Sequence, residues 1–386
     1  MRTLGQQVVL ARTVRKLHIS FPSAIPWPDD IMQNALAAAR SRLELPEEIG
    51  QHWSSTPADR RSDAATAFLV ALTPNIELLI LGIPARSPLI SAVFRSAIDA
   101  QPYSGSQAAQ GPSMPAKRFA CLREIRVKPA ADAPYALSVG RVKELFSLLA
   151  LETFRGSQIS WTQEDGLHEF VMSDVSSGLR HVYLEAVYIR VSGISSLLSH
   201  CPELKPLRLE VIVSASGLDY EALGQELRVN GKRLETLDMD FDYPVYDDEF
   251  SGSDEPEIRQ NGRIGPLKDL HQLKHLSIPH QILVGPEFSG SETGPLGPGR
   301  KCPPLKLLEA VPDSLETLYL YSRSGDDDHH IAEELCGMIK SRKPVKLRQI
   351  GVDKSLSLPE DIWASGWEFC RGLGLRLRHR DSVPGV

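Results

Sequence analysis

A six-residue pattern recurs seven times along the chain and constrains its fold more than any other feature. The pattern is a leucine, a charged residue, any residue, an aliphatic residue, any residue and a second aliphatic residue, as in LETLDM at residues 234–239. The other six copies begin at Leu122, Leu179, Leu204, Leu273, Leu315 and Leu347. Ordinary residue frequencies predict roughly one copy by chance. Seven copies therefore indicate repeated structural units.

The alternation at the end of the pattern is typical of a β-strand. Successive side chains on a strand point to opposite faces, so the last two aliphatic residues point to the same side. The leading leucine precedes the strand and is expected to pack below it. One such unit cannot bury its apolar face alone, but a neighbouring unit can cover it. The residues between the aliphatic positions should point outward, which explains why they are polar and variable.

The segments between these strands have the spacing of amphipathic helices. Apolar residues three and four positions apart predict helices within residues 87–98, 139–150, 192–202 and 330–340. Strands that alternate with helices form parallel sheets. We therefore predict an α/β fold, a leucine-rich-repeat-like solenoid of the horseshoe type, with parallel strands on the concave face and helices on the convex face.

Weaker copies of the pattern extend the array in both directions. VRKLHI (residues 14–19) and IELLIL (residues 76–81) have the same register, with helices predicted within residues 29–43 and 58–72. LETFRG begins the pattern at Leu151 but fails at its sixth position, and residues 369–380 suggest a last strand or cap. We assign residues 1–100 to degenerate repeats or a cap, 101–118 to a loop, and 119–386 to the repeat array, with insertions at 243–262 and 285–304.

The repeats resemble those of leucine-rich-repeat proteins. Stretches such as LLSHCPELKPLRLE (residues 197–210) and VPDSLETLYLY (residues 311–321) are similar to the irregular repeats of F-box-type proteins of filamentous fungi. The asparagine that regular members place after the last aliphatic residue is missing here; Asp242 and Arg323 stand at two of the equivalent positions. The resemblance implies substrate or partner recognition, in some relatives as the adaptor of a Skp1–cullin ubiquitin ligase.

An F-box would be needed for that adaptor role. LPEEI, at residues 45–49, matches the opening of such a box. The segment that follows, GQHWSSTPADRRSD, lacks the leucines that would dock Skp1. We therefore expect Skp1 as a partner only if an F-box is present.

Composition excludes several classes of function. The net charge of −6 gives no basic field that would attract nucleic acid or an anionic membrane. The most apolar window, residues 64–82, is interrupted by Pro74 and predicts a helix followed by a strand rather than a membrane span. The N-terminus lacks the features of a signal peptide, and the five cysteines have no zinc-site spacing. We expect reduced thiols and an intracellular location, in the cytoplasm or nucleus.

No motif for catalysis, a cofactor or a metal is evident. The acidic segment at residues 246–257 lacks the spacing of a calcium loop, and GDDDHH at residues 325–330 is better suited to capping a helix than to holding an ion. GPLGPGRK, at residues 294–301, lacks the end of a phosphate-binding loop. The alternative to a binding protein is an enzyme, hydrolase-like, with a site in the loop insertions.

The concave face is the candidate site. Its outward residues should form one broad surface, to which tyrosines contribute area and hydrogen bonds. We predict a non-catalytic protein–protein interaction scaffold, in a narrower form a substrate-recognition arm of a ubiquitin ligase. The predicted binding residues are His181, Tyr183, Arg208, Glu210, Asp238, Asp240, His275, Tyr319 and Tyr321.

Overall fold

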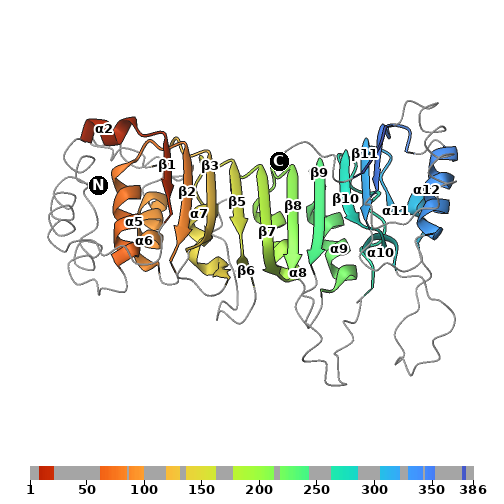
Figure 1. The fold of residues 1–386 in the computed structure, drawn as a ribbon, viewed down its shortest axis with the longest axis horizontal. Helices are drawn as coiled ribbons and strands as arrows, with labels where there is room; N and C mark the ends of the chain where they lie inside the picture. The colour runs from red at the N-terminus through yellow and green to blue at the C-terminus, as the bar shows by residue number, and fades with distance from the viewer. Residues whose placement is uncertain are drawn as a thin grey trace, which may run out of the picture. The chain divides into compact units, whose positions relative to one another are not determined.

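The chain folds into two compact α/β units, Met1–Tyr188 and Ile189–Val386. The computed structural model describes residues 8–20, 61–84, 87–99, 119–130, 136–161, 177–212, 218–242, 262–285, 305–321, 329–341, 344–352 and 376–379. Each unit has parallel strands separated along the chain by helices (Figure 1). The predicted α/β class with parallel strands is therefore confirmed.

The described part of the N-terminal unit is built on five parallel strands. Their order in the sheet follows their order in the chain, and the aliphatic and aromatic residues Leu17, Leu79, Ile125, Phe154 and Val182 stand side by side. All of these except Leu17 are fully buried. The strands are β1 (Lys16–Ile19), β2 (Leu78–Ile83), β3 (Glu124–Pro129), β5 (Thr153–Ser157) and β7 (His181–Ile189).

A second, small sheet branches from this unit. It consists of β4 (Leu137–Ser138) and β6 (Ile159–Trp161), which pair with each other, and β6 also pairs with β7. Two residues with left-handed backbone, Gln158 (φ 54°) and Ala186 (φ 51°), lie where β5 passes into β6 and within β7. Before Ala186 the buried residues of β7 have even numbers, and after it they have odd numbers. The strand therefore contains a local bulge that turns its second half.

Helices cover the buried face of the N-terminal strands. They are α2 (Val8–Thr13), α5 (Arg61–Leu72), α6 (Pro88–Asp99), a 3₁₀ turn η2 (Val139–Arg141) and α7 (Lys143–Phe146). Phe146 of α7 packs on Phe154 of β5, with ring centroids 4.6 Å apart. The buried carboxylate of Asp63 accepts hydrogen bonds from the backbone N–H groups of Leu89 and Ile90 at 2.9 and 3.1 Å, so α5 caps the N-terminus of α6.

In its described residues, the C-terminal unit repeats the arrangement with six parallel strands. Leu207, Leu237, Leu276, Leu318 and Ile350 share one register position, and each is at most 1% exposed. The prediction that these repeats place their aliphatic residues side by side is confirmed. The strands are β8 (Pro206–Ile212), β9 (Thr236–Asp242), β10 (His275–Pro279), β11 (Thr317–Tyr321), β12 (Gln349–Val352) and β13 (Arg376–His379).

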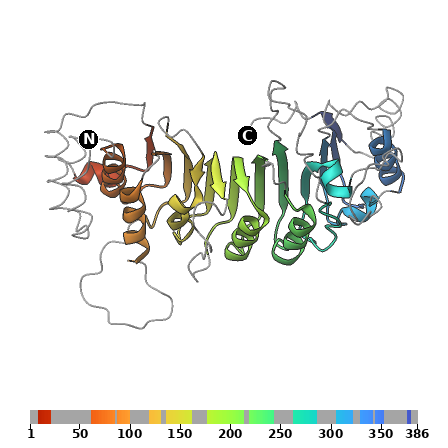
Figure 2. The same ribbon diagram turned by 90° about the horizontal axis from the view of Figure 1, so that it is seen from below.

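Helices of this unit lie on one side of its strands, as α8 and α9 show in Figure 2. They are α8 (Val191–His200), α9 (Tyr220–Asn230), α10 (His280–Val284), α11 (Leu307–Ala310) and α12 (His329–Ser341). Helix α9 was not predicted, although Asp219 caps it by accepting the Ala222 N–H at 2.9 Å. The Tyr220 ring meets Phe241 of β9 edge-on at 5.5 Å.

Most of the local predictions agree with these elements. The leading leucines of the pattern are buried, except Leu347, which is half-buried. The weak repeats form β1 and β2, the last strand is β13, and the helix predicted at 139–150 is reduced to η2 and the single turn α7. Residues 29–43, 45–49 and 101–118, and most of both predicted insertions, lie outside the described residues. Within the described part of the chain, no helix is long and apolar enough to cross a membrane.

Candidate functional site

The face of the strands that points away from the helices carries most of the predicted binding residues. In the C-terminal unit we call this surface the C-terminal exposed face. The backbone register of this face places Arg208, Asp238, Ser277 and Tyr319 side by side. Two residues further along β8 and β9, Glu210 stands next to Asp240. It consists of Arg208, Glu210, Thr236, Asp238, Asp240, His275, Ser277, Thr317, Tyr319 and Gln349.

An ion pair joins the first two strands of this face. The Arg208 Nε lies 3.4 Å from Asp238 Oδ2, and both side chains are partly exposed. Glu210 and Asp240 add two carboxylates beside this pair. The face therefore has more acidic than basic groups among its described side chains.

Tyr319 is held flat against the next strand by a glycine. Gly351 of β12 stands beside Tyr319 in the register, and a Cβ atom at Gly351 would lie 2.0 Å from two atoms of the tyrosine ring. The Gln349 side-chain amide donates a hydrogen bond to the Tyr319 hydroxyl. Tyr319 is thus pre-positioned as a half-buried aromatic platform on the exposed face.

Tyr321 departs from the prediction. Alternation along β11 placed it with Thr317 and Tyr319 as an outward residue, but it is only 3% exposed. Its hydroxyl donates a hydrogen bond to the carbonyl of Met239, one residue past the last position where β9 is paired with β10. Tyr321 therefore stabilises the sheet where these two strands part, and its ring is not available as a binding surface.

The N-terminal unit presents a surface of different charge. The predicted residues His181 and Tyr183 lie on it, and sequence analysis missed their neighbours Arg126 and Arg155. We call it the N-terminal exposed face; β2 contributes Leu78 and Ile80 to it, and its polar and aromatic residues are Lys16, His18, Glu124, Arg126, Lys128, Thr153, Arg155, His181, Tyr183 and Glu185.

Glu124 organises the basic residues of this face. Its Oε1 atom lies 2.8 Å from Arg126 Nε and 3.2 Å from Arg155 Nε. The Arg155 guanidinium carbon lies 4.4 Å from the centroid of the Tyr183 ring, a cation–π contact. Thr153 and His181 share a hydrogen bond of 3.1 Å between adjacent strands. LETFRG is a weak copy of the pattern in the sequence, and its strand pairs with β7 as the repeat order predicts, but Arg155 was not among the predicted binding residues.

The neighbouring β6 is the reason that LETFRG fails the pattern. Gly156 occupies the sixth position of LETFRG, and a Cβ atom there would lie 2.3 Å from the Ile159 Cδ1 atom and 3.1 Å from Leu184 Cδ2. The space that an aliphatic side chain fills in the other repeats is filled here by Ile159. The segment is a complete strand, with Arg155 on its exposed face.

A row of charged residues runs along the edge where the strands begin. We call it the edge ladder; it is the charged second position of the repeat pattern, immediately before the strand of each repeat that carries the pattern. Its sign alternates in both units. It consists of Arg15, Glu77, Arg123, Glu152 and Arg180 in the N-terminal unit, and of Lys205, Glu235, Lys274, Glu316 and Arg348 in the C-terminal unit.

The backbone of the ladder is equally regular. The carbonyl of Glu235 accepts two hydrogen bonds from the next repeat, from the N–H groups of Lys274 at 2.8 Å and His275 at 3.0 Å. The same fork recurs between neighbouring repeats of both units, for example from Glu77 and Leu78 to Arg15. These bonds fix each ladder side chain next to that of the following repeat.

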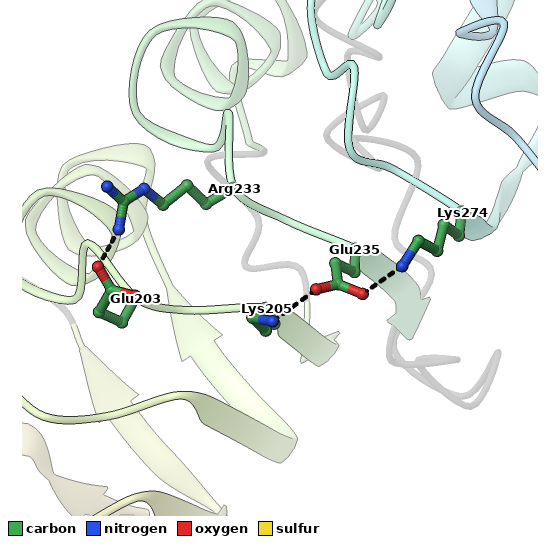
Figure 3. A network of polar contacts seen from close by, with 5 residues as sticks. All are labelled: Glu203, Lys205, Arg233, Glu235 and Lys274. Carbon is green, nitrogen blue, oxygen red and sulfur yellow. Dashed lines mark hydrogen bonds and ion pairs between the residues drawn. The ribbon is translucent and has the colours of Figure 1, made fainter.

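Ion pairs connect the ladder side chains. The pairs are Arg15–Glu77 at 3.6 Å, Arg123–Glu152 at 3.3 Å, Lys205–Glu235 at 2.8 Å and Glu235–Lys274 at 2.7 Å. Figure 3 shows Glu235 between the two lysines, with the Glu203–Arg233 pair beside them. Sequence analysis required a charge at this position but overlooked the alternation of its sign. Opposite charges on adjacent repeats favour this stacking register over one that would bring like charges together.

Glu235 is the most perturbed acid in the ladder. Hydrogen bonds from Lys205 and then Lys274 lower its pKa from 4.5 to about 2. The same contact raises the pKa of Lys274. Because the carboxylate is favoured in the folded state, its ionisation is coupled to folding.

Replacing Glu235 by glutamine is expected to lower the free energy of unfolding by about 1 kcal/mol at neutral pH, since partly exposed ion pairs contribute about 0.2–1 kcal/mol each. The folded pKa of about 2 lies below the ordinary value of 4.5. The stabilisation is therefore complete above pH 4.5 and disappears as the pH falls towards 2. Urea denaturation of both proteins across this range measures the difference.

The matched control for this experiment is Glu333→Gln, an exposed acid on α12 of the same unit. It should change stability little at any pH. A Glu235→Gln effect that stayed constant from neutral pH to pH 2 would contradict the role of the two lysines.

The other candidate chemistry of the described residues is sparse. No group of three or more His, Cys, Asp or Glu side chains in the described ranges is arranged to hold a metal ion. Among the described cysteines, Cys121, Cys201 and Cys336 form no disulfide bond. GDDDHH at 325–330 and the insertions proposed to hold an enzymatic site fall outside the described side chains, so both remain predictions.

Comparison with known proteins adds no further assignment: no family model matches the chain, and a search of the curated proteins finds no match to it.

Proposed function

We propose that the chain is a non-catalytic protein-binding scaffold, a leucine-rich-repeat-like solenoid, whose C-terminal exposed face recognises the partner. The observation that supports this most is the row of polar and aromatic side chains in register across β8 to β11, on the side opposite α8 and α9. Broad sheet faces of repeat arrays are suited to binding extended protein surfaces.

The chemistry of this face favours a partner that brings basic groups. On β8 and β9, the strands whose charged side chains the structure describes on this face, Glu210, Asp238 and Asp240 outnumber Arg208. Complementary charge steers association and excludes partners of the wrong sign. Tyr319 contributes a rigid aromatic surface, since Gly351 and Gln349 fix its ring before any partner arrives.

The resemblance to F-box-type proteins gives a narrower form of this proposal, in which the scaffold is the recognition arm of a Skp1–cullin ubiquitin ligase. Its support is the sequence resemblance and LPEEI at residues 45–49. Proteins captured by the tagged chain from cells that express it should then include Skp1 and a cullin.

The double change Asp238→Ala with Tyr319→Ala is expected to reduce partner capture at least about tenfold, because central aromatic and charged residues dominate such interfaces. Quantitative affinity capture from the native cell, scored protein by protein against the unchanged chain, measures this. Both side chains are partly exposed, so the melting temperature should fall only slightly.

The matched control is Glu221→Ala with Val229→Ala, which removes one carboxylate and one apolar side chain from the exposed surface of α9 in the same unit. This variant should retain every partner. Equal capture by the two double variants would count against the C-terminal exposed face as the recognition surface.

A further inference from the structure

Two arginines on neighbouring strands of the N-terminal exposed face are held beside each other by one carboxylate. Arg126 of β3 and Arg155 of β5 are partners in the backbone register. Their Nε atoms lie 2.8 and 3.2 Å from the same oxygen atom, Glu124 Oε1, so the two Nε atoms are no farther apart than the sum of these distances. Tyr183, the register partner of Arg155 on the other side, packs its ring on the Arg155 guanidinium, whose carbon lies 4.4 Å from the ring centroid.

The outer nitrogen atoms of this arginine pair retain hydrogen-bond donors for a ligand. The side chains of Arg126 and Arg155 are 46% and 35% exposed. Among the described residues, both reach Glu124 through Nε alone, and no hydrogen bond or ion pair engages their Nη atoms. Each guanidinium therefore has N–H donors left, and its planar shape suits a carboxylate. Because Glu124 carries one negative charge, the group of three residues has a net positive charge.

Two apolar side chains lie beside the arginine pair on the same face. Leu78 and Ile80 of β2 are half-buried, and Ile80 is the register partner of Arg126. The arginines and Ile80 belong to a row that crosses five strands. Since neighbouring strands are about 4.8 Å apart and an extended chain advances about 3.3 Å per residue, the row is as long as an extended segment of about six residues. We call it the basic row; it consists of His18, Ile80, Arg126, Arg155 and Tyr183.

The charge around the basic row favours a short acidic peptide segment over a nucleic acid. Among the described residues of the N-terminal exposed face, four positive side chains face two negative ones: Lys16, Arg126, Lys128 and Arg155 against Glu124 and Glu185. The whole chain has a net charge of −6 and therefore has no general attraction for a long polyanion. A short peptide contacts the positive face alone, and an apolar side chain beside its carboxylates fits the half-buried Ile80.

We propose that the basic row is a second recognition surface, which binds an extended acidic segment of a partner protein. Carboxylates of the segment accept hydrogen bonds from Arg126 and Arg155, and an apolar side chain next to them packs on Ile80. Glu124 and Tyr183 position the two guanidinium groups before the segment arrives, which reduces the entropy lost on binding. The basic row lies in the N-terminal unit, so this proposal does not rest on the function proposed for the C-terminal exposed face.

Fluorescence anisotropy with the full chain and labelled pentapeptides tests the proposal. The probe is EELEE, which places a carboxylate on each side of the leucine whichever way its backbone runs. QQLQQ has the same shape without the charges and should bind at least about tenfold more weakly, the factor expected from one hydrogen bond between charged groups. EEGEE lacks the apolar side chain and should bind about fivefold more weakly, since a leucine that is only partly buried gains part of its full transfer free energy.

Four variants test the assigned roles. Arg126→Gln with Arg155→Gln should weaken EELEE binding at least about tenfold. Arg126→Lys with Arg155→Lys retains both charges but loses the planar donors, and it should weaken binding at least about threefold. Ile80→Ser should bind EELEE and EEGEE equally. The matched control is Arg12→Gln with Lys143→Gln, which removes two positive charges from α2 and α7 of the same unit and should bind EELEE as the unchanged chain does.

Equal binding of EELEE and QQLQQ to the unchanged chain would overturn the proposal, as would the absence of saturable EELEE binding; this comparison needs no variant. Full EELEE binding by the double lysine variant would show that a general positive field attracts the peptide. An oligothymidylate of the same charge that bound as tightly as EELEE would assign the row to a nucleic acid instead. Dimers in analytical ultracentrifugation that the double glutamine variant dissociates would make a second copy of the chain the occupant and would also overturn the proposal.

Discussion

Replacing Gly224 by alanine is expected to lower the free energy of unfolding of the C-terminal unit by about 3 kcal/mol, because overpacking against a fixed backbone is among the costliest single changes. A Cβ atom at this position in α9 would lie 1.9 Å from the Ile264 carbonyl oxygen. Arg228 Nη1 donates to that oxygen at 2.9 Å, and the Ile264 N–H donates to the Ile282 carbonyl at 2.9 Å. The segment is held on both sides and cannot move away without breaking these bonds.

The same substitution at Gly337 provides the control. Gly337 lies on α12 of the same unit, and a Cβ atom there would meet no atom within 4 Å. Alanine should stabilise this helix by about 1 kcal/mol, as helix propensity predicts. Chemical denaturation of the two variants should therefore give changes of opposite sign. Destabilisation of similar size in both would show that the close approach of α9 to Ile264 is not the cause.

Replacing Leu276 by alanine is expected to cost about 2–5 kcal/mol of unfolding free energy, the range for deleting most of a buried leucine. Leu276 of β10 is 1% exposed and stands between Leu237 of β9 and Leu318 of β11. Neither neighbour can fill the cavity without leaving its own repeat. Equilibrium denaturation in urea measures the loss.

Ser277→Ala is the adjacent control for this prediction. Ser277 lies on the C-terminal exposed face. Substitutions of surface residues that take no part in core packing, helix caps or buried polar networks change the free energy of unfolding by about 0.5 kcal/mol or less. Comparable losses for Leu276→Ala and Ser277→Ala would contradict the alternation of buried and exposed side chains along β10.

The parallel strands could be predicted because the signal is local and repeated. Leu237, Leu276 and Leu318 each lie in the same six-residue pattern, and the alternation within it determines which side chains are buried. The order of the strands follows from the chain, since every repeat adds its strand beside the previous one within its unit. Helix α9 had a signal too, in the capping residue Asp219, but its weaker apolar stripe was overlooked.

Other features depend on contacts between repeats and have no local signal. Tyr321 has the alternation of an exposed residue, and its burial follows from the point at which β9 and β10 part. Gly156 breaks the pattern because Ile159, on a different strand, fills its space. The contact between α6 and α7 joins Arg95 to Glu144, 49 residues later in the chain, and no spacing in the sequence connects them.

The edge ladder could be predicted from the sequence only in part. Its alternating signs are readable in the sequence once the repeats are aligned, from Arg15 to Arg180 and again from Lys205 to Arg348. In chain order, Arg180 and Lys205 are consecutive ladder positions of the same sign, and the division between the two units falls between them. Only the structure shows that neighbouring members form ion pairs, as Glu235 does with Lys274.

The stacking of repeats in register is tested most directly by a double-mutant cycle between Leu276 and Leu318, with Leu276 and Leu207 as the comparison. Leu276 and Leu318 are register neighbours, whereas Leu237 separates Leu276 from Leu207 by two strand spacings of about 4.8 Å each. We predict a coupling energy of about 0.5–3 kcal/mol for the neighbouring pair and additive effects for the separated pair. Additive effects in both pairs would contradict the stacked register.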